Sequence, residues 1–132
     1  YNRPATSSNA LLALDGQRQN PAQPSLLKGD VWVQPTSVCT NNRHFRRRQI
    51  EIYPGQLCVG SPRGIDSCRG DSGGPLVNGR SEVLVGLVSG SAGCGLTGTP
   101  SIFTDVGFYR DWIDRAKDAA VRLRANRKHP FR

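Results

Sequence analysis

Short apolar runs separated by turn-forming residues fill most of the chain. The runs span residues 11–14, 26–33, 57–60, 75–77, 83–88 and 102–106. Residues 83–88 alternate with both faces apolar, which is the pattern of a strand that is covered on both sides. Pairs such as Asn20-Pro21 and Asn78-Gly79 lie between the runs and favour tight turns. Six short strands at this spacing predict an all-β fold, either a small closed antiparallel barrel or a sandwich.

The pattern changes at Gly107. Apolar residues now recur at helical spacing, at Phe108, Trp112, Ile113, Ala116 and Val121. Basic residues gather towards the end of this stretch, where the helix dipole favours cations. We therefore expect one helix over residues 107–125, followed by a basic tail over residues 126–132. Residues 1–9 are polar and lack periodicity, so we expect them to form a linker.

Length and composition fit one globular domain. The chain has 132 residues, 36% of them hydrophobic, and its 15 glycines bring it into the usual range of folded proteins. A disordered polycation is therefore excluded. No apolar run approaches the roughly 18 residues of a membrane span. The sequence contains no methionine and no signal-peptide pattern, and it opens at Tyr1, so we expect a processed piece of a longer precursor.

The net charge of +8 favours polyanionic neighbours. The charge gathers in two places, a short loop with Arg43, Arg46, Arg47 and Arg48 and a tail with Arg122, Arg124, Arg127, Lys128 and Arg132. Neither stretch has the interleaved aromatic residues of a single-strand nucleic-acid binder. Two interpretations stay open: a solvated basic surface, and a polyanion site formed by the four arginines of the loop.

The four cysteines are Cys39, Cys58, Cys68 and Cys94. None of them forms a CxxC pair, and neither histidine completes a metal-ligand spacing, so we expect neither a metal nor a cofactor. Four cysteines allow three pairings. Two internal disulfides are the best interpretation, which places the chain in an oxidising compartment, either secreted or inside a secretory granule or vesicle.

Residues 66–75 carry the candidate chemistry and read Asp-Ser-Cys-Arg-Gly-Asp-Ser-Gly-Gly-Pro. A nucleophilic serine needs a tight bend, with backbone N–H groups that converge on the oxyanion formed in acyl transfer. Gly70, Gly73 and Gly74 allow such a bend without Cβ clashes. The same residues are also those of an ordinary glycine-rich turn.

Residues 70–75, Gly-Asp-Ser-Gly-Gly-Pro, resemble the active-serine motif of the chymotrypsin/trypsin family of serine proteases. Further segments resemble that family at residues 56–60, 84–89, 93–94, 99–104 and 110–113, so the likeness covers about residues 10–118. It implies that residues 10–106 form the C-terminal six-stranded barrel of a two-barrel protease. The stretch 11–16 would then be its first strand.

The resemblance also implies roles for single residues. Ser72 would be the nucleophile, and the amides of Gly70 and Ser72 would form the oxyanion hole. Asp66 would lie at the base of the specificity pocket and pair with a substrate Arg or Lys. The other residues implied in substrate binding are Ser67, Ser89, Ser91 and Ser101. The disulfides would be Cys39–Cys58 and Cys68–Cys94.

Several departures from the family pattern limit these expectations. Gly90 stands where most members have a tryptophan. Ser91 and Ser101 stand where trypsin-like enzymes have glycines, and their added side chains are expected to narrow the pocket. The sequence before Ser72 contains one histidine, His44, at a position where the family has no catalytic residue. The catalytic His and Asp must therefore come from an absent N-terminal barrel, and so must the ammonium group that pairs with Asp71 in this family.

These points predict the C-terminal chain of a two-chain trypsin-like serine endopeptidase that acts on proteins or peptides. Its partner would be the N-terminal barrel from the same precursor, held without a disulfide because both bridges are internal. The alternative is a catalytically inactive homologue that acts as a basic binding protein. Ser72 and all three glycines of the motif are present, which favours the enzyme. A nucleic-acid-binding or structural module is a third, weaker hypothesis.

Overall fold

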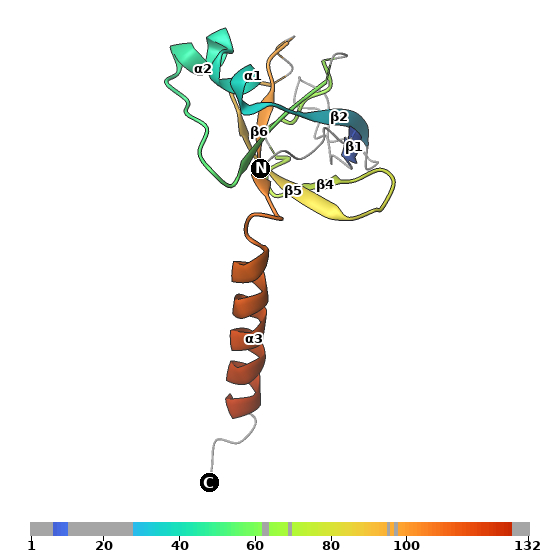
Figure 1. Ribbon diagram of the computed structural model, residues 1–132, viewed down its shortest axis with the longest axis vertical. Helices are drawn as coiled ribbons and strands as arrows, with labels where there is room; N and C mark the ends of the chain where they lie inside the picture. The colour runs from blue at the N-terminus through green and yellow to red at the C-terminus, as the bar shows by residue number, and fades with distance from the viewer. Residues whose placement is uncertain are drawn as a thin grey trace.

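A computed structural model describes residues 7–10, 28–61, 64–68, 70–94, 96 and 98–127. Six strands form an antiparallel barrel, with two short helices on one side and a long helix that projects from it (Figure 1). The strands are β1 Ser7–Ala10, β2 Gly29–Gln34, β3 Gln56–Gly60, β4 Pro75–Val77, β5 Leu84–Ser91 and β6 Ser101–Asp105. The helices are α1 Thr36–Thr40, α2 Arg43–Arg47 and α3 Arg110–Arg127.

The strand order around the barrel is β1-β2-β3-β6-β5-β4, and the barrel closes where Ala10 of β1 pairs with Leu76 of β4. Every pairing between neighbouring strands is antiparallel. Closure leaves no unpaired sheet edge, which a sandwich would retain. The prediction of a six-stranded antiparallel barrel with a C-terminal helix is confirmed.

The first strand lies elsewhere than the apolar pattern suggested. β1 occupies Ser7–Ala10, inside the segment expected to be a linker, and pairs with β2 from Ser7↔Trp32 to Ala10↔Gly29. The linker prediction is therefore wrong for residues 7–9. Strand pairing satisfies backbone N–H and C=O groups whatever the side chains, so a polar sequence gave no signal for it. The apolar run 11–14 and the turn at Asn20-Pro21 lie outside the described residues.

The long helix begins and ends slightly later than expected. Residues 107–109 form a turn in which the Asp105 carboxylate accepts a hydrogen bond of 3.2 Å from the Phe108 amide. α3 then runs from Arg110 to Arg127, and none of its side chains is buried. Among the described residues, no helix is both long and apolar enough to cross a bilayer.

Two short helices stand where a basic loop was expected. α1 follows Pro35, and α2 begins after Asn42, whose side chain accepts a hydrogen bond of 2.9 Å from the His44 amide. Asparagine is a favoured N-cap residue because it satisfies an amide that the helix leaves open. The Asn42 side-chain amide also donates to the Gly98 carbonyl at 3.0 Å. This bond ties the helical segment to the loop that precedes β6.

Neighbouring residues of β3 and β6 point to opposite sides and build two apolar clusters. The cluster inside the barrel consists of Val31, Val59, Leu76, Val88 and Phe103. The second cluster lies against α1 and α2 and consists of Cys39, Phe45, Cys58, Ala92 and Ile102. The helices thus cover the outer face of these two strands, which explains why their sequences are apolar on both faces.

Both disulfides implied by the resemblance are present, Cys39–Cys58 and Cys68–Cys94. The bonded cysteines are 19 and 26 positions apart in the sequence, and each bridge is expected to stabilise the fold by about 3 kcal/mol. All four cysteines of the chain are used in these two bonds.

Replacing Phe45 with alanine is expected to lower the free energy of unfolding by about 3–5 kcal/mol. The Phe45 side chain is fully buried between α2 and the Cys39–Cys58 bridge, so its removal leaves a cavity that the bridge keeps from collapsing. Urea unfolding with the disulfides intact measures this effect. Val38→Ala on α1 is the control, because Val38 is 40% exposed and its loss should cost less than about 1 kcal/mol. Equal losses for both variants would contradict the packing described.

Candidate active site

Ser72 lies on a tight bend between the barrel interior and strand β4. The Asp71 amide donates to the Cys68 carbonyl at 3.1 Å, and the Gly74 amide donates to the Asp71 carbonyl at 2.8 Å. Gly70 and Gly73 have φ of +96° and +83°, a region that other residues rarely adopt. The bend leaves Ser72 exposed. The Ser72 side chain is therefore accessible, and Gly70 and Gly73 supply the φ angles that the bend needs.

Two backbone hydrogen bonds to β5 and one hydrogen bond to a buried carboxylate hold the bend in place. The Gly73 amide donates to the Val88 carbonyl at 2.8 Å, and the Val88 amide donates to the Gly74 carbonyl at 2.9 Å. Asp71 is 2% exposed, and its Oδ2 accepts a hydrogen bond of 2.7 Å from the Cys68 amide. Its side chain thus turns inward while Ser72 faces out. The ion pair expected for Asp71 stays a prediction.

Three of the residues implied in substrate recognition meet beside this bend. Ser67 Oγ donates to Ser101 Oγ at 3.0 Å, and Ser101 Oγ donates in turn to Asp66 Oδ1. Ser67 and Ser101 are buried, whereas Asp66 is half-buried. The three residues thus form one hydrogen-bonded group, in which the Asp66 carboxylate accepts from the Ser101 hydroxyl.

The remaining serines of the predicted site line the end of β5. Ser91 is the register partner of Ser101 on β6, and its Oγ donates to the Gly93 carbonyl at 3.2 Å. Ser89 is exposed at the point where the pairing of β5 and β6 shifts register. A Cβ built at Gly90, between them, would meet no atom within 4 Å. The space that a large side chain fills in most family members is thus open here.

His44 does not take part in this site. It lies on α2, and its Nε2 accepts a hydrogen bond of 3.2 Å from Arg43 Nε. Among the described residues, none forms a hydrogen bond with the Ser72 hydroxyl. The other histidine, His129, lies outside the described residues. The described part of the chain also lacks any cluster of three or more His, Cys, Asp or Glu side chains that could hold a metal ion.

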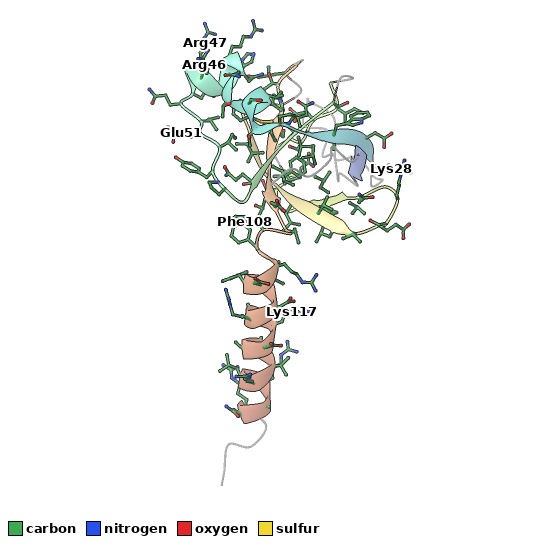
Figure 2. All side chains as sticks on the ribbon, viewed as in Figure 1. Lys28, Arg46, Arg47, Glu51, Phe108 and Lys117 are labelled. Carbon is green, nitrogen blue, oxygen red and sulfur yellow. A yellow bond between two sulfur atoms is a disulfide. The ribbon has the colours of Figure 1, made fainter. Side chains whose placement is uncertain are left out.

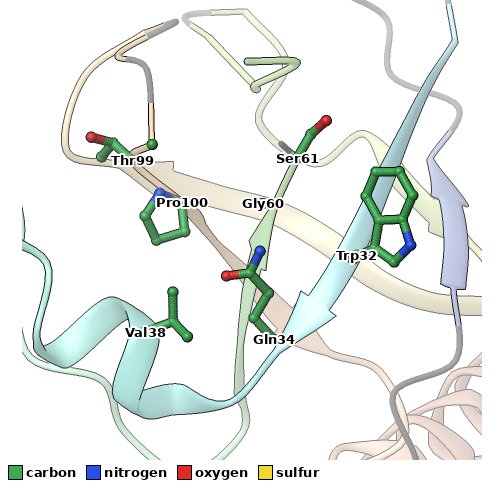
Figure 3. Close-up of a pocket in the computed structure, with 8 residues that line it drawn as sticks. Trp32, Gln34, Val38, Gly60, Ser61, Thr99 and Pro100 are labelled. Carbon is green, nitrogen blue, oxygen red and sulfur yellow. The ribbon is translucent and has the colours of Figure 1, made fainter. Parts of the chain in front are cut away.

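A surface cavity of about 470 Å³ lies away from the serine bend, between β2, α1, β3 and the loop before β6 (Figure 3). Its lining residues are Trp32, Gln34, Val38, Gly60, Ser61, Gly98, Thr99 and Pro100. None of these residues was predicted to bind substrate, although Gly60, Thr99 and Pro100 lie in segments that resemble the family. Trp32 and Gly60 are register partners on β2 and β3, and the Asn42–Gly98 hydrogen bond holds the loop before β6 near the helical segment.

The antiparallel barrel, the serine on a glycine bend and the half-buried aspartate near it are together typical of serine proteases. The sequence matches the trypsin family over residues 7–113. The chain belongs to the trypsin family.

Individual relatives agree with this assignment. The chain is 50% identical over 100 residues to phenoloxidase-activating factor 1 of Holotrichia diomphalia, covering 74% of the chain and 27% of that protein. It is 42% identical over 95 residues to melanization protease 1 of Drosophila melanogaster, covering 67% and 23%. Among solved structures it is similar to neuropsin, a serine protease expressed in the limbic system of mouse brain. The TM-score is 0.68 at 26% identity, and the match covers 86% of this chain and 49% of neuropsin. The chain thus spans about a quarter of these curated relatives and half of neuropsin.

Proposed function

We propose that this chain is the nucleophile-bearing C-terminal chain of a secreted, two-chain, trypsin-like serine endopeptidase. The observation that carries the proposal is the bend at residues 68–74, which exposes Ser72 while it buries Asp71 and sets two glycines at positive φ. This combination leaves the Ser72 hydroxyl accessible while it fixes the backbone on which the serine stands. The two internal disulfides fit the oxidising compartment of a secreted protein.

In the proposed reaction, Ser72 Oγ attacks the scissile carbonyl carbon and loses its proton to a histidine of the N-terminal barrel. The amides of Gly70 and Ser72 stabilise the resulting oxyanion. The histidine returns the proton to the leaving amine, which leaves an acyl group on Ser72. Water then hydrolyses this ester. Asp66 selects Arg or Lys before the cleaved bond, because a carboxylate and a guanidinium form strong charge-assisted hydrogen bonds.

The proposed N-terminal barrel docks without a disulfide, since all four cysteines pair within this chain. Apolar side chains near the start of α3 supply a surface for that barrel. Phe108 is 58% exposed and Trp112 is 62% exposed, and α3 extends into free space (Figure 1). Exposed apolar surface of this kind commonly marks a contact with a partner. The match to 49% of neuropsin is the share expected for one barrel of two.

An organofluorophosphonate probe is expected to label Ser72 when the chain is assembled with its N-terminal barrel. Such probes react with a serine that has a general base and a formed oxyanion hole, so the chain alone should react far more slowly. Intact-mass analysis and peptide mapping locate the adduct. Ser72→Ala is the matched control, and Ser81→Ala should leave labelling in place because Ser81 is exposed in the turn between β4 and β5. Absence of an adduct in the full assembly would favour the alternative of an inactive, basic binding protein.

A further inference from the structure

The arginines of α2 and its C-cap form an exposed cationic surface that the proposed reaction does not use. Arg43, Arg46, Arg47 and Arg48 are all exposed, and the labelled Arg46 and Arg47 point away from the barrel (Figure 2). We call these four residues the α2 arginine cluster. Among the described residues, none of these four arginines forms an ion pair with a carboxylate. The ion pair that the described residues do form, Arg110–Asp114, lies on α3. Four guanidinium groups thus face solvent without an ion-pair partner among the residues that the structure describes.

The acidic group that comes closest along the sequence is already engaged. Residues 36–50 contain no Asp or Glu, and Glu51 follows them. Glu51 Oε2 accepts a hydrogen bond of 2.7 Å from the Tyr53 hydroxyl. This bond and the negative charge of Glu51 raise the pKa of Tyr53, so the tyrosine stays a neutral donor to Glu51. The Glu51 carboxylate thus contacts Tyr53, and among the described residues it forms no ion pair with the α2 arginine cluster.

The cluster stands on a rigid base. Phe45, in its middle, is fully buried in the outer apolar cluster, and Cys39 just before α2 is bonded to Cys58 of β3. Asn42 caps α2 and also holds the Gly98 carbonyl. The backbone that carries the arginines therefore loses little entropy on binding. A preorganised surface binds more tightly than a flexible one with the same charges.

We infer that the α2 arginine cluster is a binding site for a linear sulfated polysaccharide. Arginine recognises sulfate oxygens through paired N–H groups. Both disulfides place the chain in an oxidising compartment, where nucleic acid is not the usual polyanion. Phe45, the apolar residue of α2, is buried, so a lipid bilayer has no apolar side chain of α2 to receive, and no exposed Phe, Tyr or Trp ring alternates with the four arginines to stack on bases. This inference does not depend on catalysis by Ser72.

The test is binding of a size-defined heparin oligosaccharide to the protein in its native assembly, measured by calorimetry at several salt concentrations. Replacing all four arginines of the cluster with glutamine is expected to weaken binding on the order of 10- to 100-fold, with a shallower salt dependence. The matched control removes the same charge from α3, as Arg115→Gln, Lys117→Gln, Arg122→Gln and Arg124→Gln, all exposed residues. It should change affinity by less than about threefold, because distant charges are screened. Equal losses in both variants would overturn the inference, since binding would then depend on net charge alone.

Two further measurements test the fold of the glutamine variant and the chemistry of the partner. Replacing the four arginines with lysine keeps the charge but loses the paired N–H groups, so its affinity should lie between that of the parent and that of the glutamine variant. Desulfated heparin should not bind at the same salt concentration. Tighter binding to double-stranded DNA or to phosphatidylserine vesicles than to the oligosaccharide would show that the assigned partner is wrong. Probe labelling of Ser72 should be unchanged in the glutamine variant, so failure of this inference is distinguishable from failure of the proposed function.

Discussion

Replacing Asp66 with asparagine is expected to reduce kcat/KM for substrates with Arg or Lys before the cleaved bond by on the order of 100- to 1000-fold. The substitution removes the negative charge that a substrate guanidinium would meet but keeps the size of the side chain. The asparagine oxygen still accepts from Ser101 Oγ, so the pocket wall should stay in place. Peptide pairs that differ only in Arg or Leu at that position measure the effect. Cleavage after Leu should change by less than about threefold.

The Ser101 hydroxyl provides a second test of the same pocket. It occupies one oxygen of Asp66, so Ser101→Gly should free that oxygen and raise cleavage after Arg by up to about tenfold. Ser91→Gly is the matched control, because the Ser91 hydroxyl bonds to Gly93 rather than to Asp66. Equal cleavage after Arg and Ala, or an Asp66→Asn enzyme that behaves like the parent, would show that the serines close the pocket.

Replacing Gly70 with alanine is expected to lower kcat by about 100- to 1000-fold with little change in KM. Gly70 has φ of +96°, where a Cβ is strained, and relief of that strain would turn its amide away from the developing oxyanion. An oxyanion donor acts mainly in the transition state, so kcat falls rather than substrate binding. Steady-state kinetics and the rate of fluorophosphonate labelling should fall together.

Gly98→Ala separates this effect from a general loss of stability. Gly98 also has a positive φ, of +72°, and a Cβ there would meet no atom within 4 Å. The backbone strain caused by alanine at Gly98 should therefore resemble that caused at Gly70. Gly98, however, lies in the loop before β6 and not at the serine bend. We expect a similar fall in melting temperature and nearly unchanged kcat. If both variants lose activity in parallel with stability, the oxyanion role of Gly70 is wrong.

Local patterns account for what sequence reasoning anticipated. Five strands lie close to their apolar runs, because alternating burial on a barrel is visible within a few residues. α3 follows its helical spacing to within three residues of the expected start. The glycine bend at Ser72 was also visible, since its positive φ angles depend on residues that are neighbours in the chain. The short helices α1 and α2 were missed, although Asn42 is an N-cap signal that points to α2.

The sequence by itself determined the all-β class, the glycine bend at Ser72 and the clustering of four arginines, all of which depend on residues that are close in the chain. Only the tertiary structure decided that Ser101 donates to Asp66, 35 residues away, because that contact depends on the place of β6 beside the serine bend. It also decided that the first strand is Ser7–Ala10, since strand pairing is set by backbone partners on β2 rather than by side chains. The tertiary structure likewise decided that the four arginines form one exposed surface, because the burial of Phe45 beneath α2 sets which side of that helix faces solvent.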